Sequence, residues 1–326
     1  FEQGEDRDFS RIPKEGGGII CPVRRSRKIQ LSHTYNDIIS LENLCLAWEE
    51  FIVGKKKKAD VIQFERNLMD NIVDLNQSLV NKTYQHGSYE SFFINDTKRR
   101  HIHKASVRDR LLHHAVYRIL YPFFDKTFIA DSYSCRNEKG THKAINRYRT
   151  LTRIVSKNQA RTCWVLKCDI RKFFASIDHD VLFTILKEYI PDVDILWLLK
   201  NIIESFETTG PHPALSLEER GGNISFSVKE KARTRSSVGL PLGNLTSQLF
   251  ANIYLNKFDH WVKHTLKSHY YIRYADDFVF LSRDRFRLED VVPKFKNFYK
   301  RTLNFPCTLT NYLLALLLLG SIFWGG

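Results

Sequence analysis

The most constraining feature of the sequence is the pair of adjacent acids in Tyr274-Ala275-Asp276-Asp277. Aromatic and β-branched residues flank this pair on both sides, which predicts two strands joined by a tight turn. Two carboxylates about 4 Å apart repel each other by roughly 4 kcal/mol at an effective dielectric constant of about 20. A bound divalent cation relieves that repulsion, and oxygen ligands alone favour Mg²⁺ or Mn²⁺. The alternative is an ordinary hairpin in which both acids are solvated turn residues.

A third acid, Asp169, ends an apolar run that begins at Thr162. The pattern after it turns helical, so Asp169 is predicted at the C-terminal end of a buried strand. Three carboxylates of this kind can clamp two metal ions about 3.5–4 Å apart for in-line displacement at phosphorus. Taken alone, Asp169 would be better explained as the N-cap of a helix.

Between these acids lies the segment from Gly239 to Gln248, which an amphipathic helix follows. Its Gly and Pro residues exclude regular structure at the start. A glycine-containing entry lets the backbone approach a ligand closely, as a templating base pair or a nucleotide would require. The alternative is a plain loop before a core helix.

Taken together and in this order, the three segments resemble the motifs of reverse transcriptases. Two upstream segments look like parts of the fingers in bacterial and group II intron-like enzymes. The matching segments are residues 169–174 (motif A), 240–248 (motif B), 274–277 (motif C), and 106–115 and 131–144 (fingers).

The resemblance covers roughly residues 35–304. It implies an α+β right-hand polymerase with fingers and palm, in which helices back an antiparallel palm sheet. We predict the following parts: a flexible basic arm over 1–34, N-terminal helices and fingers over 35–157, a palm over 158–304 with an insertion at about 207–238, and an atypical apolar tail over 305–326.

The resemblance further implies an RNA-directed DNA polymerase that copies a template RNA from a primer with dNTPs as substrates. Two Mg²⁺ ions are the expected cofactor, with Mn²⁺ as an alternative. Asp169 and Asp276 match the principal metal ligands, Asp277 is the less critical acid, and the carbonyl of Ile170 is a further candidate ligand. Phe174 matches the sugar gate, where an aromatic ring excludes a ribose 2′-hydroxyl.

Basic and motif B residues supply the predicted contacts to nucleotide and nucleic acid. Arg100 is the first candidate for a triphosphate contact because a guanidinium offers a fork of donors. Leu242 and Gly243 are expected beside the incoming nucleotide. The predicted nucleic-acid contacts are Arg108, Arg136, Ser247, Gln248 and Tyr274.

Motif B also suggests a subfamily. Most reverse transcriptases have Gln-Gly and a final Ser-Pro there, whereas this chain has Leu242-Gly243 and Ser247-Gln248, similar to enzymes of diversity-generating retroelements. Those enzymes misincorporate opposite adenines of a template-repeat RNA. A leucine cannot donate the hydrogen bond with which Gln orients the nucleotide, a loss of about 0.5–1.5 kcal/mol. Some phage-defence reverse transcriptases end motif B similarly, so a defence enzyme is the alternative.

The overall charge agrees with a polyanionic partner. Fifty Lys and Arg residues against 36 Asp and Glu residues give a formal charge of +14, which suits nucleic acid. Six cysteines without a Cys-x-x-Cys motif indicate a reduced, cytoplasmic protein. The resemblance implies that it is encoded by a bacterium or a phage. No signal peptide is visible and no membrane partner is expected; a small basic accessory protein is expected in the retroelement hypothesis.

The match to the family stops after Asn304. The run over residues 313–324 is predicted as a helix that is apolar all round, which must be buried. It is shorter than the roughly 20 residues that span a bilayer. The expected primer grip, thumb and general-acid lysine are not visible, so the thumb is predicted to be truncated. A catalytically impaired RNA-binding remnant is therefore a third hypothesis.

Overall fold

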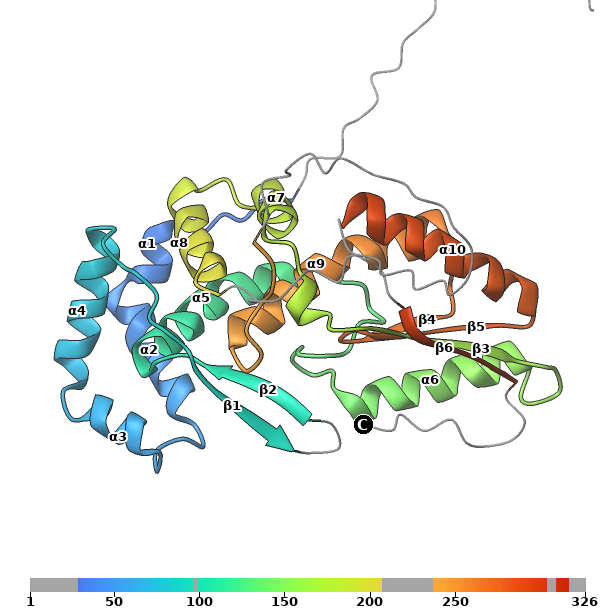
Figure 1. The fold of residues 1–326 in the computed structure, drawn as a ribbon, viewed down its shortest axis with the longest axis horizontal. Coiled ribbons are helices and arrows are strands. Elements are labelled where there is room, and N and C mark those ends of the chain that lie inside the picture. The colour runs from blue at the N-terminus through green and yellow to red at the C-terminus, as the bar shows by residue number, and fades with distance from the viewer. Residues whose placement is uncertain (1–28, 96–98, 207–236, 304–308, 317–326) are drawn as a thin grey trace, which may run out of the picture.

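The computed structural model describes residues 29–95, 99–206 and 237–303, together with the backbone of 309–316 (Figure 1). Most of the arm predicted over 1–34 and of the insertion predicted at about 207–238 lies outside the described residues. Helices and strands are mixed and the sheets are antiparallel, so the predicted α+β architecture is confirmed. The described part contains no helix long and apolar enough to cross a membrane.

The N-terminal half is built from packed helices. They are α1 (Tyr35–Ile39), α2 (Leu41–Ile52), α3 (Ala59–Glu65), α4 (Leu68–Val80) and α5 (Val107–Asp125). Ser40 and Ser106 cap α2 and α5, because each hydroxyl accepts a hydrogen bond from a backbone N–H of the first turn. Helix α5 continues past Pro122 to Asp125, although a proline there predicts a helix end.

A two-stranded hairpin, β1 (Glu90–Asn95) and β2 (Arg99–Lys104), connects α4 to α5. It extends from the helical half and lies beside the remainder of the molecule (Figure 1). Phe92, Phe93 and Ile94 of β1 are exposed. The Phe93 ring stacks on His101 of β2 with ring centroids 4.4 Å apart, which stabilises the pair across the hairpin.

The second half contains a four-stranded antiparallel sheet with strand order β4-β5-β3-β6. Its strands are β3 (Trp164–Ile170), β4 (Tyr271–Tyr274), β5 (Asp277–Ser282) and β6 (Leu309–Leu316). The hairpin of β4 and β5 pairs through β5 with β3, so strands more than a hundred residues apart in the chain become neighbours.

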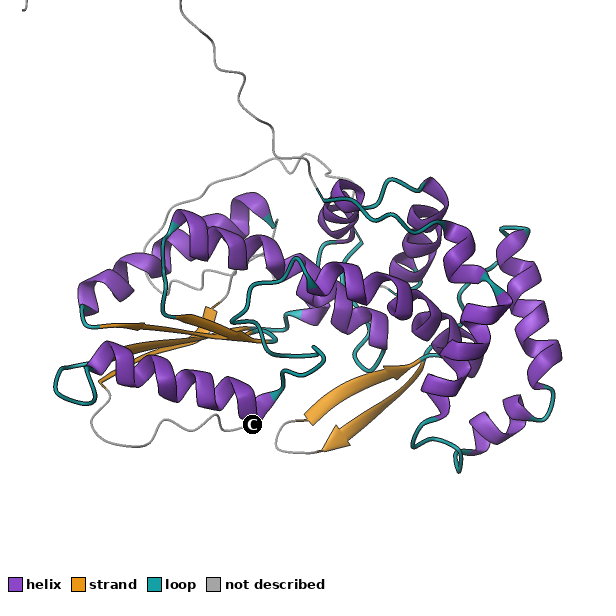
Figure 2. Ribbon diagram, turned by 180° about the vertical axis from the view of Figure 1, so that it is seen from behind, coloured by secondary structure: helices purple, strands orange, loops and turns teal. Residues whose placement is uncertain are grey.

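Helices cover both faces of this sheet (Figure 2). The remaining helical segments are α6 (Thr141–Ser156), η1 (Phe174–Ser176), α7 (His179–Tyr189), α8 (Val193–Glu204), α9 (Leu245–His260), η2 (Trp261–Thr265) and α10 (Arg285–Thr302). Cys168 and Phe278 point into the main core with α9 and α10, whereas Val165 and Val279 pack with α6. This alternation follows from the two-residue period of a strand, because successive side chains point to opposite faces.

Helix α9 is buried on nearly all sides. Its apolar side chains contact both halves of the molecule, and it packs against α5 and α7. A helix that is buried all round belongs to the centre of a core rather than to its surface. The predicted motif B helix is therefore the element to which the two halves are attached.

The structure corrects the prediction for the C-terminal apolar run. Residues Leu309–Leu316 form strand β6 and pair with β3, whereas a helix was predicted from residue 313 onward. A continuous apolar run shows no periodicity, so it fits a buried helix and a strand inside a sheet equally well. The edge of β3 that does not pair with β5 favours the strand, because the backbone groups along that edge need hydrogen-bond partners.

Candidate functional site

The turn of the β4–β5 hairpin carries the two adjacent acids. Tyr274 pairs with Asp277, so Ala275 and Asp276 form the two-residue turn between them. Ala275 has a φ of 53°, the left-handed conformation that a tight two-residue hairpin needs and that non-glycine residues seldom adopt. Asp276 and Asp277 are both half-buried. The predicted hairpin is confirmed.

Strand register brings Asp169 to the same end of the sheet. The last described pair between β3 and β5 joins Cys168 to Phe278. One residue further along, Asp169 follows Cys168 and Asp277 precedes Phe278, so the two acids lie on neighbouring strands at equal height. By alternation both belong to the face on which Val165 and Val279 lie.

A β-bulge occurs between Asp169 and Ile170 in the pairing with β6. Bulges change the direction of a side chain at the end of a ladder and are frequent beside active sites. The Ile170 side chain is buried, so only its backbone carbonyl is available as a ligand. Asp169 is half-buried on the opposite side of the strand.

The donor set of this site fits a hard divalent cation. Asp169, Asp276 and Asp277 supply only carboxylate oxygens, which Mg²⁺ and Mn²⁺ prefer. Within the described residues, however, no three His, Cys, Asp or Glu side chains converge closely enough to form a finished metal site. The ammonium group of Lys167 lies close to one of these acids, with its Nζ 4.0 Å from Asp277 Oδ1. The backbone thus brings the acids together, and their side chains would have to turn to share an ion.

The motif B loop is attached to the hairpin of the N-terminal half. The backbone N–H of His103 donates to the carbonyl of Leu242 at 2.9 Å, and Asn244 Nδ2 donates to the carbonyl of His103 at 3.0 Å. Gly243 has a φ of +109°, and a Cβ there would lie 2.9 Å from Ile102 Cγ2. This glycine therefore permits a close approach to β2, and the predicted approach of the backbone to a ligand stays a prediction.

Phe174 lies between the motif A strand and the motif B loop. It begins the short helix η1, is half-buried, and packs edge-on against Phe173 with ring centroids 5.5 Å apart. Its carbonyl accepts a hydrogen bond of 2.8 Å from Leu240 N. Phe174 follows Asp169 by five residues in the chain, and its half-buried ring is compatible with the predicted sugar gate.

The other predicted contacts differ in accessibility. Ser247 is buried in the first turn of α9, whereas Gln248 and Leu242 are half-buried and Gly243 is exposed. Tyr274 is half-buried and its hydroxyl lies 2.9 Å from Thr141 Oγ1 at the start of α6. Gln248, Leu242 and Gly243 are thus accessible to a ligand to some degree, and Ser247 is not.

The three predicted arginines have different surroundings. Arg100 is exposed on β2. Arg108 donates to Ser78 Oγ at 2.7 Å and lies over the Tyr84 ring. The side chain of Arg136 is only 6% exposed, and its guanidinium donates to Asp125 and to the carbonyls of Ile129 and Ser132. These internal acceptors give Arg136 a structural role, so we do not include it among the proposed nucleic-acid contacts.

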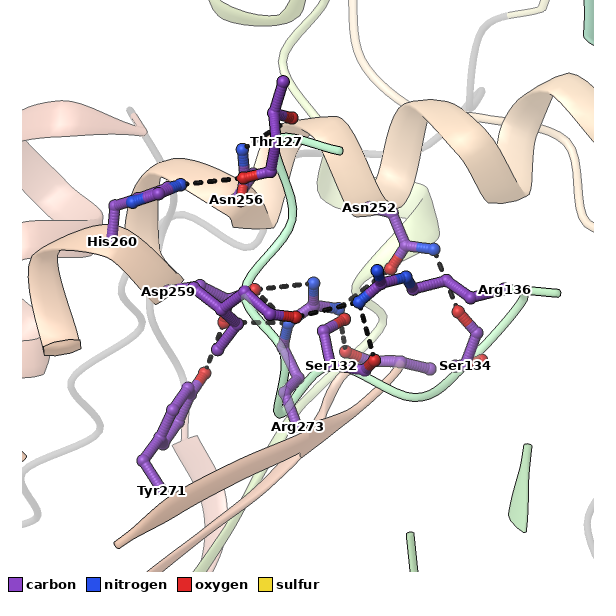
Figure 3. Close-up of polar contacts among 12 residues, drawn as sticks. Thr127, Ser132, Ser134, Arg136, Asn252, Asn256, Asp259, His260, Tyr271 and Arg273 are labelled. Atoms are coloured by element: carbon purple, nitrogen blue, oxygen red, sulfur yellow. Dashed lines mark hydrogen bonds and ion pairs between the residues drawn. The ribbon is translucent and has the colours of Figure 1, made fainter. Parts of the chain in front are cut away.

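A buried ion pair next to the turn was not predicted from the sequence (Figure 3). The fully buried Arg273 donates to both carboxylate oxygens of Asp259 in α9 at 2.8–2.9 Å, and Tyr271 donates to Asp259 Oδ1 at 2.6 Å. Burial opposes the charge on Arg273, but Asp259 outweighs it and raises the pKa of the guanidinium. Burial, followed by the charge of Asp259, raises the pKa of Tyr271 well above its usual value. An arginine inside an apolar strand was the signal available in the sequence.

The same arginine connects three segments that are distant in the chain. Its backbone N–H donates to the carbonyl of Asp131, and its carbonyl accepts from Tyr133 N at 3.0 Å. Its side chain also reaches Asn252 of α9 at 3.0 Å. The fingers segment, the motif B helix and the motif C hairpin therefore meet at one residue.

The chain matches a known protein family and is similar in sequence to several known proteins. A family model described as "Reverse transcriptase (RNA-dependent DNA polymerase)" matches residues 90–305. The chain is 26% identical to Protein YkfC of Escherichia coli (strain K12) over 157 residues, which cover 48% of this chain and 35% of that protein. It is 24% identical to the Group II intron-encoded protein LtrA of Lactococcus lactis subsp. cremoris over 196 residues, which cover 59% of this chain and 28% of that protein.

Among solved structures, a chain of the partial Cas6-RT-Cas1–Cas2 complex aligns with 83% of this chain and 43% of its own length. The TM-score is 0.42 and the sequence identity is 23%. The match to each of these relatives thus spans less than half of the other protein's length.

Proposed function

Because the chain belongs to the reverse transcriptase family, we propose that it copies RNA into DNA, with Asp169, Asp276 and Asp277 as its catalytic acids. The primer 3′-oxygen forms a bond to the α-phosphorus of a dNTP, the bond to pyrophosphate breaks, and the hydroxyl proton leaves to solvent. The observation that carries this proposal is the strand register, which aligns Asp169 with the turn of the β4–β5 hairpin.

The three acids would hold two Mg²⁺ ions, with the carbonyl of Ile170 as a further ligand. When bound, such ions would acidify the primer hydroxyl and neutralise the leaving pyrophosphate. Lys167 supports the acids in the absence of metal, because its ammonium lies 4.0 Å from Asp277 Oδ1 and reduces their mutual repulsion. Its side chain must yield part of this interaction when Asp277 takes a metal.

The remaining residues bind and select the nucleotide. Arg100, which is exposed on β2, is the proposed triphosphate contact, and the half-buried Phe174 ring is the proposed restriction on a 2′-hydroxyl. Leu242 and Gly243 lie in the loop that β2 holds through His103, so the nucleotide site combines motif B with the hairpin. Gln248 and Tyr274 are the proposed contacts to template or primer, with Arg108 as a contact to the RNA backbone.

Primer extension on a defined RNA template tests this function. Asp276→Asn keeps the shape of the side chain but removes its charge, so we expect extension to be abolished while RNA binding stays within about twofold. Asp290→Asn is the matched control, because it removes the same charge from the exposed face of α10. Extension by Asp276→Asn at the rate of the control would refute the assignment.

For the biological role we propose error-prone copying of a template-repeat RNA in a diversity-generating retroelement, with a small basic accessory protein as partner. Leu242 and the Ser247-Gln248 end of motif B support this subfamily. Sequencing of cDNA made on a defined template should show errors concentrated at adenines. Errors spread evenly over the four bases would favour the defence-associated alternative.

A further inference from the structure

Arg273 is in direct contact with the turn that carries Asp276. Its Nη1 donates hydrogen bonds of 3.0 Å to two acceptors, the Oδ1 of Asn252 and the carbonyl of Ala275. Ala275 is the turn residue with the left-handed backbone, and its carbonyl belongs to the peptide that leads into Asp276. A fixed donor on that carbonyl therefore sets the orientation of the peptide plane and the position of the Asp276 backbone.

Asn252 determines where this donor points. It is 3% exposed in the middle of α9, and its Nδ2 donates to the carbonyl of Ser134 at 3.0 Å (Figure 3). Asp259 holds the Nε and Nη2 edge of the guanidinium and balances its charge. Asn252 adds no charge to this pair, so its contribution is geometric: it keeps Nη1 in reach of Ala275.

We propose that Asn252 and Arg273 are positioning residues, through which α9 sets the place of the catalytic turn relative to Asp169. This inference rests on the proposed function, because it assigns Asp276 to the chemistry. Both residues are buried, so they would act through the turn rather than on the substrate directly. Since α9 is buried on nearly all sides, it gives the turn a rigid reference.

The chain offers a matched pair of variants for the test. Asn256 lies one helical turn after Asn252, is 4% exposed, and donates to Thr127 Oγ1 at 3.3 Å, away from the hairpin. Asn252→Ala and Asn256→Ala both remove a buried amide from the same helix, but Asn252→Ala also loses a bond from the charged Arg273, so a larger loss of melting temperature is expected for it. The kinetics are therefore compared at a temperature well below both melting transitions. Only Asn252→Ala releases Nη1 of Arg273.

Steady-state primer extension distinguishes positioning from general stability. We expect Asn252→Ala to lower kcat at least tenfold, to leave the dNTP KM within about twofold, and to raise the Mg²⁺ concentration for half-maximal rate. Asn256→Ala should stay within twofold in all three. Arg273→Lys keeps a cation for Asp259 but has one nitrogen for three acceptors, so it should reproduce the kcat defect if circular dichroism shows it folded.

The outcomes separate this inference from the proposed function. Equal kcat values for Asn252→Ala and Asn256→Ala, in a wild type that extends primers, would overturn the positioning role alone. A wild type that binds RNA but does not extend primers would overturn the proposed function and this inference with it.

A second, independent observation concerns the outer side of α6. Lys143, Arg149 and Arg153 are exposed on this helix, and Lys157 is exposed at its C-cap. The sequence from residue 139 to residue 168 contains no Asp or Glu. Arg149, Arg153 and Lys157 form no ion pair with any acid in the part of the chain that the structure describes.

Helix α10, which packs on the opposite face of the sheet, shows the usual arrangement. There Arg285 pairs with Glu289, and Lys294 pairs with Asp290, each at i,i+4 spacing. On α6 the i,i+4 neighbours are like charges, which destabilise a helix by about 0.2–0.5 kcal/mol per pair. An external anion would remove this repulsion.

The basic stripe of α6, Lys143, Arg149, Arg153 and Lys157, begins at the proposed active site. Thr141 Oγ1, at the start of the helix, lies 2.9 Å from the Tyr274 hydroxyl, and the helix then leads away along the sheet (Figure 2). Residues four apart advance by about 6 Å along the axis. We infer that this stripe binds the backbone of template RNA outside the segment being copied, an inference that also rests on the proposed function.

Salt-dependent RNA binding tests this surface. The triple variant Arg149→Gln, Arg153→Gln and Lys157→Gln should reduce the slope of log K against log salt by about 2, because each lost contact to single-stranded RNA removes about 0.7. The matched control, Lys296→Gln, Lys300→Gln and Arg301→Gln on α10, removes the same charge. Extension on a short template should stay within twofold in both triple variants.

Two results would overturn the role of α6. One is an equal change of slope in both triple variants, which would show a general charge effect. The other is an unchanged slope in the α6 variant with full primer extension, which would leave the proposed function intact.

Discussion

The ammonium nitrogen of Lys167 lies 4.0 Å from Oδ1 of Asp277, and the two residues project from neighbouring strands on the same face of the sheet. Both side chains are about one-third exposed, at 29% and 34%. The pair is therefore worth no more than about 1 kcal/mol, as is usual for ion pairs open to water. It nevertheless places a positive charge where a metal-binding acid is proposed.

Replacing Lys167 should strengthen metal binding. Lys167→Met removes a cation that competes with Mg²⁺ for Asp277 but keeps an unbranched side chain of similar length. About 1 kcal/mol corresponds to roughly fivefold, so the Mg²⁺ concentration for half-maximal extension should fall by up to about fivefold. A titration of primer extension with Mg²⁺ measures it. An increased Mg²⁺ requirement would instead mean that Lys167 helps to place the acid.

Gly243→Ala should destabilise the contact between motif B and the fingers hairpin. A Cβ at this position would lie 2.9 Å from Ile102 Cγ2, and the φ of +109° is itself unfavourable for alanine. Gly140 provides the control, because its φ is +88° and a Cβ would meet nothing within 4 Å. We therefore expect a larger drop in melting temperature for Gly243→Ala than for Gly140→Ala. Combining Gly243→Ala with Ile102→Ala should recover part of the difference, and no recovery would mean that backbone strain alone is responsible.

Phe174→Ala should relax the discrimination against ribonucleotides. Loss of the aromatic ring opens space for a 2′-hydroxyl, and a steric contact of this size is worth about 1–3 kcal/mol, or tenfold or more. The neighbouring Phe173 is buried in the core at 2% exposure, so Phe173→Leu is the control and should change stability but not selectivity. The ratio of kcat/KM for rNTP and dNTP measures the effect; an unchanged ratio in Phe174→Ala would leave the ring a purely structural role.

The local pattern of the sequence predicted the strands and helices that carry the acids. Alternating apolar residues around Asp276 and the apolar run before Asp169 are one-dimensional signals, and the structure has β3, β4 and β5 there. Whether Asp169 lies opposite the hairpin depends on the register between β3 and β5. Local sequence patterns do not determine this register, and only the resemblance to a family predicted it.

The partners of buried polar residues could not be predicted in this way. Nothing near Arg273 in the sequence identifies Asp259 as its counter-ion, because that acid lies on a helix and the pairing arises only from tertiary packing. The same holds for Gly243, whose close neighbour is Ile102 of a distant hairpin. The apolar tail was assigned to a helix because periodicity alone does not distinguish a buried helix from a strand.

The protein should lose stability in mild acid because of His113. This residue is buried on α5. Burial, followed by the nearby His86, lowers its pKa to about 3, and the charge of Asp109 opposes this shift only in part. The unfolded chain, with a pKa of about 6.5, therefore binds a proton that the folded state does not. This contribution to stability is retained well above pH 6.5 and falls below it, with a slope that approaches about 1.4 kcal/mol per pH unit from about pH 5.5 down to about pH 4.

A variant isolates this contribution from the general effect of the +14 charge. His113→Gln does not titrate, so its free energy of unfolding should fall by about 1 kcal/mol less than that of the wild type between pH 6.5 and pH 5.5, because the unfolded histidine is already half protonated at pH 6.5. His114, whose pKa burial and the nearby Lys55 lower to about 4, stays in both proteins and cancels in the comparison. Denaturant unfolding at the two pH values measures the difference. Parallel losses in the two proteins would show that His113 is already protonated in the folded state at pH 5.5.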